Sequence, residues 1–507
     1  MPNNIAYLKT VYNQGDYTVP RVHVTNLTRP LSREPAGYAG VVAIIGAFPS
    51  EEQEVLAFTS YEAILQHYGI EENTSAEAAF DGLRAAKQIL RSQNHAATRG
   101  ASSVIVANIT SFNRSSEKLD DDKTYAQILD EIIAENQDAT YEDLFRELSE
   151  YHIAAVEDDP TTDENEEAPE QVVNFYQTTM TGKKLTQALN RLYTEQFDFI
   201  FPASLFASVE FTVEVEDDSE AGNSTGEIEV QGQEAYKAIQ NFLNDEFRLQ
   251  RPAQFVAPLQ TRNYVPPRRV EDATLREKAN INQNINIADV RSYYEVFHED
   301  VFSLGGFYTQ RIKIQYNGEA TNLDLLETAA YMQGFIASLP VGASLTYNKT
   351  IPGVVGVIDE MSVGPNDTGY LLAQLGFPVI VCKKRNALMN TSEYCVLNSS
   401  LPCGFDISQI RAVSYLIKQY DLQQFLGLPN SAATRAQIGA ELATTNANVM
   451  SDVDIIDSID TSNIYVPERN GRLCPQEVYI ECHVIVHGVI IVINLGVNME
   501  ESIGVQE

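Results

Sequence analysis

The stretch from Val478 to Val497, near the end of the chain, limits the possible folds more than any other, because nearly all of it is strand-forming. Up to His487 apolar and polar side chains alternate, which predicts a strand with one buried face. After Gly488 the run Val489–Ile493 is apolar on both faces. A strand with two apolar faces and little sequence after it needs cover from another chain. We therefore expect this terminus to join subunits.

The beginning of the chain carries a second strand-like region. Residues Asn4 to Leu27 are rich in β-branched and aromatic side chains around an Asn-Gln-Gly-Asp turn, and no helical pattern lies next to them. Pro20 restricts the second strand to a sheet edge or to its first residues. We expect an extended arm, the counterpart of the terminal strand.

Between these ends, continuous apolar strands alternate with helical patterns. Gly40–Phe48 and Gly100–Ile109 are such strands, with helices expected at Ser60–Tyr68 and Ser75–Ser92 between them. Further along, the sequence predicts helices at 184–196, 233–247, 322–338, 407–426 and 429–446, and strands at 197–203, 253–258, 353–357 and 377–382. Strands that are apolar on both faces are typical of a sheet covered by helices on both sides. The expected fold class is mixed α/β and multidomain.

The charge of the chain is uneven. Its 507 residues carry Lys+Arg 35 and Asp+Glu 70, a net charge of −35. That balance argues against nucleic-acid binding, which needs a basic surface. Segment Glu117–Phe175 has 20 acidic and 3 basic residues, so it supplies 20 − 3 = 17 of these negative charges. We interpret it as a surface insertion, with helices expected at 125–136 and 141–156 and an open acidic run at 157–170.

A chain of this length is expected to form more than one domain. The predicted organisation is an α/β core with surface insertions, an α+β C-terminal domain, and extended arms at both ends. Its parts are an N-terminal arm (1–27), the first part of the core (28–116), the acidic insertion (117–175), the rest of the core (176–318) with an acidic hairpin at 213–232, the C-terminal domain (319–488) and a C-terminal arm (489–507).

Motifs for catalysis or cofactor binding were sought and not found, so we expect no enzyme, cofactor or metal. The chain has no phosphate-binding loop, no Gly-x-Gly-x-x-Gly, no His-Glu-x-x-His and no Gly-x-Ser-x-Gly. His483 and His487 share a strand face but are separated by roughly 13 Å, too far for one metal. Four aspartates resemble a calcium loop without its glycine and closing glutamate, and a polar turn is the simpler interpretation: Asp452, Asp454, Asp457 and Asp460.

Cellular context follows from cysteine usage and hydropathy. The five cysteines are scattered without a Cys-x-x-Cys, which is typical of folding in a reducing cytoplasm. No signal peptide is expected at the N-terminus. The longest apolar run, near the C-terminus, is too short to span a bilayer, so no membrane association is expected.

Seven parts of the chain, taken in order, carry a resemblance to a known family: Val19–Val24, Gly40–Phe48, Gly100–Val106, Leu185–Ala203, Gly353–Val357, Leu371–Ile380 and Ile410–Val413. In this order of elements the chain resembles the contractile tail sheath proteins of bacteriophages and related injection machines. Family members have a middle domain called subtilisin-like for its topology, but this sequence has no Ser-His-Asp constellation around it. By resemblance, the final domain would face the inner tube.

The resemblance implies a viral tail sheath protein, a structural part of the bacteriophage virion that is made and assembled in the host cytoplasm. Many copies would form a helical assembly around the inner tail tube protein, with baseplate and tail terminator proteins as further partners. Contraction would drive the tube through the host envelope for genome ejection. The arms would join subunits through strands that include these residues: Tyr7, Val11, Tyr17, Val19, Val22, Val24, Val484, Val486, Val489, Ile491, Ile493 and Leu495.

Three other interpretations stay open on the sequence. The sheath could belong to a bacterial injection system or a tailocin. An acidic α/β hydrolase would need a nucleophile beside a base. A capsid or tube protein also exchanges arms between subunits, but a tube is usually built from a smaller, β-rich subunit.

Overall fold

The structure, a computed structural model, describes residues 40–50, 55–91, 100–114, 151–158, 171–177, 180–206, 209–215, 224–230, 232–259, 287–316, 319–347, 349–361, 363–364, 367–386, 391–469 and 472–487. The expected N-terminal arm (1–27) and C-terminal arm (489–507) lie outside these residues. So does the helix expected at 125–136.

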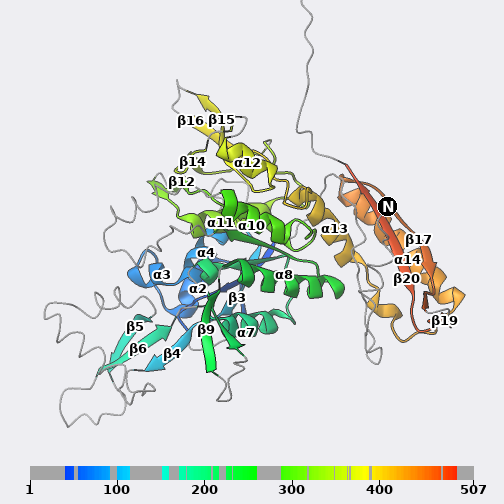
Figure 1. The fold of residues 1–507 in the computed structure, drawn as a ribbon, viewed down its shortest axis with the longest axis horizontal. Helices are drawn as coiled ribbons and strands as arrows, with labels where there is room; N and C mark the ends of the chain where they lie inside the picture. The colour runs from blue at the N-terminus through cyan, green and yellow to red at the C-terminus, as the bar shows by residue number, and fades with distance from the viewer. Residues whose placement is uncertain are drawn as a thin grey trace, which may run out of the picture.

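A six-stranded sheet forms the centre of the fold, in the order β11-β10-β7-β1-β3-β2 (Figure 1). Its strands are β1 (Val41–Gly46), β2 (Val55–Phe58), β3 (Ser103–Asn108), β7 (Phe199–Pro202), β10 (Gln254–Pro258) and β11 (Leu304–Tyr308). Neighbouring pairs run parallel except β2, which is antiparallel to β3. Nearly every residue of the central strands is buried, as their continuous apolar sequences predict.

Helices cover both faces of this sheet. Helices α4 (Asp81–Arg91) and α11 (Leu325–Ser338) pack together on one face, and α7 (Gly182–Leu192) and α8 (Gly232–Arg248) pack on the other. The connections β1 to β3 and β3 to β7 run in opposite directions across the sheet, so the fold is doubly wound. The remaining helices near the core are α2 (Tyr61–Tyr68), α3 (Ser75–Ala79), α10 (Ile287–Phe297) and α12 (Thr368–Gln374), with a short 3-10 helix, η1 (Ala203–Phe206).

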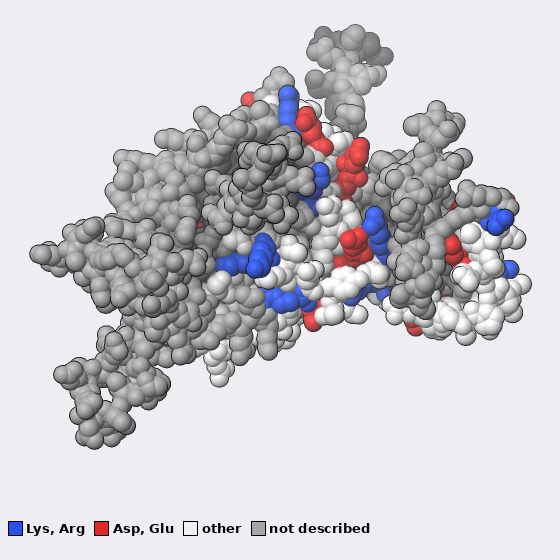
Figure 2. Space-filling model, turned by 60° about the horizontal axis from the view of Figure 1, so that its bottom comes forward, with Lys and Arg blue, Asp and Glu red and all other residues white. Residues whose placement is uncertain are grey.

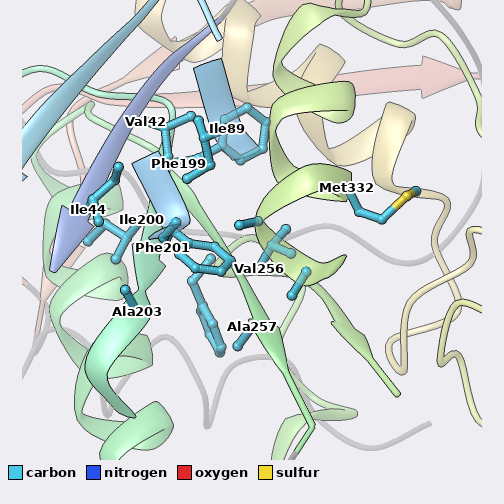
Figure 3. Close-up of a cluster of buried hydrophobic side chains, with 14 of the residues drawn as sticks. Val42, Ile44, Ile89, Phe199, Ile200, Phe201, Ala203, Val256, Ala257 and Met332 are labelled. Atoms are coloured by element: carbon cyan, nitrogen blue, oxygen red, sulfur yellow. The ribbon is translucent and has the colours of Figure 1, made fainter. Parts of the chain in front are cut away.

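The main hydrophobic core lies between the sheet and these helices. Figure 3 shows side chains of β1, β7, β10 and α4 gathered together, including Ile44, Phe201, Val256 and Ile89. These four side chains are fully buried, as is Met332 of α11, which belongs to the same core. Burial of this kind is the main source of the free energy that stabilises the fold.

Several smaller sheets surround the core. Strands β4 (Ser111–Arg114), β6 (Gln171–Gln177) and β5 (Tyr151–Asp158) form one antiparallel sheet, and β8 (Val209–Val215) pairs with β9 (Ser224–Val230) in the expected acidic hairpin. Others combine β13 (Glu319–Asn322), β12 (Ile312–Tyr316) and β14 (Val354–Val357), and β15 (Ile380–Asn386) with β16 (Thr391–Val396).

Two expectations about helices were wrong. The helix predicted at 75–92 is two helices, because Phe80 has extended backbone angles and its ring is buried, while the Gly82 amide donates to the Ala47 carbonyl oxygen at 3.1 Å. The helix predicted at 141–156 is wrong for its last part, because residues 151–158 form strand β5 and pair with β6. In both places contacts distant in sequence override the local pattern.

The last part of the chain forms a separate projection, visible at the right of Figure 1. It contains α14 (Ala432–Asp452), β17 (Ile456–Tyr465), β20 (Tyr479–Val486) and a small hairpin of β18 (Glu468–Arg469) and β19 (Arg472–Leu473). Helix α13 (Ile407–Gln419) leads into it, followed by the 3-10 turn η3 (Gln423–Phe425). We call residues 420–487 the C-terminal lobe. The helix expected at 407–426 therefore ends earlier, and the one expected at 429–446 continues to Asp452.

Candidate subunit interface

A ligand of a doubly wound fold usually binds beyond the carboxyl ends of the strands, where the strand order reverses. Here that position lies between β1 and β7. The Ala47 amide after β1 donates to Ser204 Oγ after β7 at 2.9 Å, which ties the two strand ends together. The Phe48 amide donates to Asn108 Oδ1 at 3.1 Å and to Thr110 Oγ1 at 3.0 Å.

Phe48 lies just after β1. Its side chain is fully buried and stacks on Tyr68 of α2 at 5.7 Å between ring centroids, and a methyl group added at Gly82 of α4 would lie 2.4 Å from its ring. Helix α4 is therefore packed directly on the ring.

Of the titratable side chains singled out in the sequence, His483 lies on β20 and His487 directly follows it, while Asp457 and Asp460 lie on β17. His483 Nε2 is 3.9 Å from Glu481 Oε2, and His487 Nε2 is 3.5 Å from Asp457 Oδ1, so each histidine faces a different carboxylate. Across the described part of the chain, no group of three or more His, Cys, Asp or Glu could hold a metal ion. The interpretation of the four aspartates as a polar turn was wrong for Asp457 and Asp460, which lie within β17.

Strands β17 and β20 form an antiparallel two-stranded sheet. The register places Ile456 opposite Val486 and Tyr465 opposite Tyr479, with irregularities between Ile456 and Ser458 and between Asp460 and Asn463. Within the described residues, neither strand pairs with a third one. Each therefore presents a free edge of backbone donors and acceptors, a surface to which an extended segment can add.

One face of this sheet is buried against α14 and α13. Val486 and Ile456 belong to a small hydrophobic cluster with Leu416 of α13 and Val449 of α14. Val484 packs against the same cluster. An isolated two-stranded sheet is only marginally stable. This second hydrophobic cluster therefore stabilises the fold of the lobe.

A partly buried chain of hydrogen bonds connects the sheet with the helices. The Tyr420 hydroxyl donates to Asn446 Oδ1 at 2.7 Å, and Asn446 Nδ2 donates to Thr461 Oγ1 of β17 at 3.0 Å. The same hydroxyl is 3.6 Å from Cys482 Sγ of β20. Burial raises the pKa of Tyr420 well above its usual range, and it also raises the pKa of the Cys482 thiol. Both groups therefore stay neutral near pH 7.

The opposite face of the sheet is exposed. Ile485 is 57% exposed, and the rings of Tyr465 and Tyr479 lie 5.1 Å apart across the strands. Glu481 accepts hydrogen bonds from Asn463 Nδ2 at 2.6 Å and from the Tyr465 hydroxyl at 3.2 Å. Hydrogen bonds from the Ser462 backbone and side chain lower the pKa of Asp460, and His483 adds to this effect.

The lobe exposes several large apolar side chains: Leu426, Leu428, Met450, Leu473 and Ile485. On the face that Figure 2 shows, the described part of the lobe, at the right, is mostly white, with a few acidic and basic side chains. Exposed apolar side chains of this kind are common at protein interfaces.

Of the residues predicted to join subunits, the structure describes two. Val484 and Val486 lie in β20, where they pair with β17 of the same chain and face the lobe's own core. The others lie outside the described residues: Tyr7, Val11, Tyr17, Val19, Val22, Val24, Val489, Ile491, Ile493 and Leu495.

The sequence reasoning missed the importance of β17. Its apolar residues Ile456, Ile459 and Ile464 do not alternate, because irregularities shift the register twice. Strands were sought by the alternation of apolar and polar residues with a period of two, and the sequence of β17 lacks this alternation.

Comparison with known proteins gives the following matches. No protein-family model matches the sequence, and neither does any curated protein. A sheath tail protein from Listeria innocua is similar in structure, with 12% identity, a TM-score of 0.45, and coverage of 90% of this chain and 96% of that one. A sheath tail protein from Desulfitobacterium hafniense has 11% identity, a TM-score of 0.45, and coverage of 92% and 100%.

The helical sheath of the anti-feeding prophage, in its contracted state, is also similar. It has 10% identity and a TM-score of 0.42, and the match covers 95% of this chain and 99% of that chain.

Proposed function

We propose that this protein is the structural subunit of a contractile phage tail sheath. Many copies polymerise helically around an inner tail tube, and the lattice shortens to drive the tube through the host envelope. The sheath of a bacterial injection system or of a tailocin would be built and would act in the same way. The genes that neighbour this one distinguish these two alternatives from a phage. Under this proposal the protein acts mechanically and has no catalytic role.

The observation that carries the proposal is the two-stranded sheet β17–β20, which rests on its own small core and which no third strand joins among the described residues. Residue Val486 ends β20, and Val489–Leu495 follows it closely in the sequence. We propose that this segment leaves its own subunit and adds to the sheet of a neighbour, as does the N-terminal arm (1–27). Backbone hydrogen bonds would supply the connection.

The energy of such an assembly is small per contact and large in sum. Each backbone hydrogen bond contributes about 0.5–1.5 kcal/mol net, so an added strand of several residues contributes a few kcal/mol. With no nucleotide driving the movement, contraction draws on small differences in packing between an extended and a shortened lattice, summed over many copies. Each subunit moves as a body and the arms keep it tied to its neighbours.

Partners and location follow from the same proposal. The inner tail tube protein lies inside the sheath, and baseplate and tail terminator proteins bind its two ends. The particle is the virion tail, assembled in the host cytoplasm. No described helix combines the length and the hydrophobicity needed to cross a bilayer.

Electron microscopy of the purified protein at high concentration tests the proposal first. We expect hollow tubes with a regular helical surface. If isolated subunits persist, addition of purified tube and baseplate is expected to nucleate tubes, and subunits that remain single under both conditions contradict the proposal.

Two deletions then test the arms. Removing 489–507 leaves every described residue of the lobe in place, because β20 ends at Val486. Removing 1–18 likewise spares all described residues. Each variant is expected to stay a folded, soluble monomer by light scattering and thermal melting, and to form no long tubes. Long tubes from either variant would show that arm exchange is not what joins the subunits.

A further inference from the structure

Two buried polar side chains face each other's elements where α13 meets the central sheet. Gln254, the first residue of β10, is 1% exposed, and neither atom of its side-chain amide bonds to any other group in the described part of the protein. The Ser414 hydroxyl of α13 is also buried and likewise has no partner among the described residues. Buried polar groups are nearly always hydrogen-bonded, because an unpaired one costs the free energy of its desolvation. These two side chains therefore point to a bound species that supplies the missing bonds.

Both side chains line one small cavity. Its lining also includes Phe199 of β7 and Lys418 of α13, so the cavity lies between the sheet and the helix. The cavity volume is about 20 Å³. One water molecule needs about 10–15 Å³ when volume is measured in the same way. The cavity therefore has room for one or two water-sized species.

The charged side chains of the cavity bond to one another and to the backbone. Lys418 Nζ donates to Asp198 Oδ1 at 2.6 Å, and Arg411 Nη2 donates to the Leu339 carbonyl oxygen at 2.9 Å. None of these bonds reaches the Gln254 amide. What they add to the cavity is two positive charges and one negative charge, which disfavour a metal cation there.

The unpaired atoms identify the species by their chemistry. Gln254 presents an acceptor at Oε1 and donors at Nε2, and the hydroxyl of Ser414 both donates and accepts. A chloride ion would accept from Nε2 but would be repelled by Oε1. A sodium ion would bind Oε1 but would be repelled by Nε2 and by the cations of Arg411 and Lys418. Of the three, only water satisfies every one of these atoms.

We propose that this cavity holds one or two ordered water molecules, which bridge Gln254 of β10 and Ser414 of α13. A buried water typically makes about three hydrogen bonds to groups that otherwise have no partner, and it is a fixed part of the fold. The bridge attaches α13 to the central sheet. Since α13 also contributes Ala412 and Leu416 to the lobe's cluster, the bridge helps core and lobe to move as one body. The site itself does not depend on the proposed function.

A crystal structure of the full-length protein, at a resolution that shows ordered waters, tests the site directly. We expect a peak of electron density at hydrogen-bonding distance, about 2.7–3.2 Å, from the Gln254 amide and from Ser414 Oγ. A cavity without a peak, or a direct hydrogen bond between these two side chains, overturns the proposal. Soaking the crystal in bromide separates water from a halide, because bromide scatters X-rays anomalously. An anomalous peak in the cavity would show an anion site and would also overturn the proposal.

A double-mutant cycle measures the bridge in solution. Gln254→Met and Ser414→Ala each remove one partner of the water, and urea unfolding gives the equilibrium constant of each variant and of the double variant. If the two side chains share a water, the effect of Ser414→Ala on this constant is expected to be about fivefold smaller when Gln254→Met is already present. Equal effects in both backgrounds would overturn the bridge. The crystal structure of the wild type decides the matter if a variant does not fold.

The matched control is Gln240→Met, combined with the same Ser414→Ala. Gln240 of α8 is also a buried glutamine, but its Nε2 donates to Asp300 Oδ2 at 2.8 Å and it does not line the cavity. Its effect and that of Ser414→Ala are expected to be additive, because the two side chains share no water. Coupling of the same size as in the Gln254 cycle would show a general response of the core to the loss of a polar group, and it would refute the bridge.

Discussion

Two neighbouring residues of β20 offer a sharp test of the interface, because their side chains lie on opposite faces of the same strand. Val486 is 6% exposed and belongs to the lobe's core, whereas Ile485 is 57% exposed on the outer face. Substituting each with alanine separates the stability of the lobe from its assembly.

The magnitudes follow from burial. Val486→Ala removes two buried methyl groups and leaves a small cavity, a loss of about 2 kcal/mol in the free energy of unfolding of the lobe. Fully burying an isoleucine contributes about 1.5–3 kcal/mol, so the exposed part of Ile485 has about 1 kcal/mol still to gain on assembly. Ile485→Ala is therefore expected to raise the critical concentration for tube formation about fivefold.

Hydrogen exchange of β17 and β20 and sedimentation of tubes provide the two readouts. Val486→Ala is expected to speed exchange in both strands in the monomer, while Ile485→Ala leaves exchange unchanged and weakens sedimentation. An Ile485→Ala protein that assembles at the wild-type concentration would show that this face of the sheet is not buried between subunits.

Three further predictions concern the core and the insertion. Replacing residues 159–170 by Asn-Gly is expected to leave folding and tube formation unchanged, because Asp158 pairs with Gln171 and a two-residue turn can connect strands in that register. Loss of tubes would show that the insertion contributes to contacts between subunits. Gly82→Ala is expected to lower the free energy of unfolding, measured in urea, by about 3 kcal/mol. The control Gly356→Ala is expected to lower it by less than about 1 kcal/mol, because the added methyl group lies an ordinary 3.5 Å from its nearest atom. Equal losses would mean that the Phe48 ring moves aside easily. Burial raises the pKa of Glu246 to about 7, so the folded state binds this proton more tightly than the unfolded state; the resulting stabilisation is full below the unfolded pKa of about 4.5 and is lost as the pH rises to about 7. Between about pH 4.5 and 8, the free energy of unfolding of Glu246→Gln, measured in urea, is expected to rise by up to about 3 kcal/mol relative to that of the wild type. Equal pH dependence of the two proteins would refute this.

Much of the core could be predicted from the sequence. Strand β1 is a continuous apolar run bounded by glycine, and a strand buried on both faces needs such a run whatever its neighbours are. Helix α11 begins at Asp324, which forms a capping box with Glu327, so its start is also a local property. These features depend on residues close together in the chain.

Other features depend on which distant surfaces meet. The pairing of β17 with β20, the break at Phe80 and the strand β5 each follow from contacts made only in the folded chain. The ring of Phe48 is buried because α4 packs on it at Gly82, which no local pattern indicates.

The sequence by itself determined the α/β core and the strand character of the C-terminal region, since side-chain periodicity and burial are set residue by residue. The tertiary structure decided that the first half of that region pairs with β17 of its own subunit, with no third strand beside these two in the described part of the chain. It also decided that Lys418 Nζ donates to Asp198 Oδ1 and that the Tyr420 carbonyl oxygen accepts from Gln250 Nε2. Strand pairing and these polar contacts depend on side chains brought together from distant parts of the chain, and only the folded arrangement specifies which ones meet.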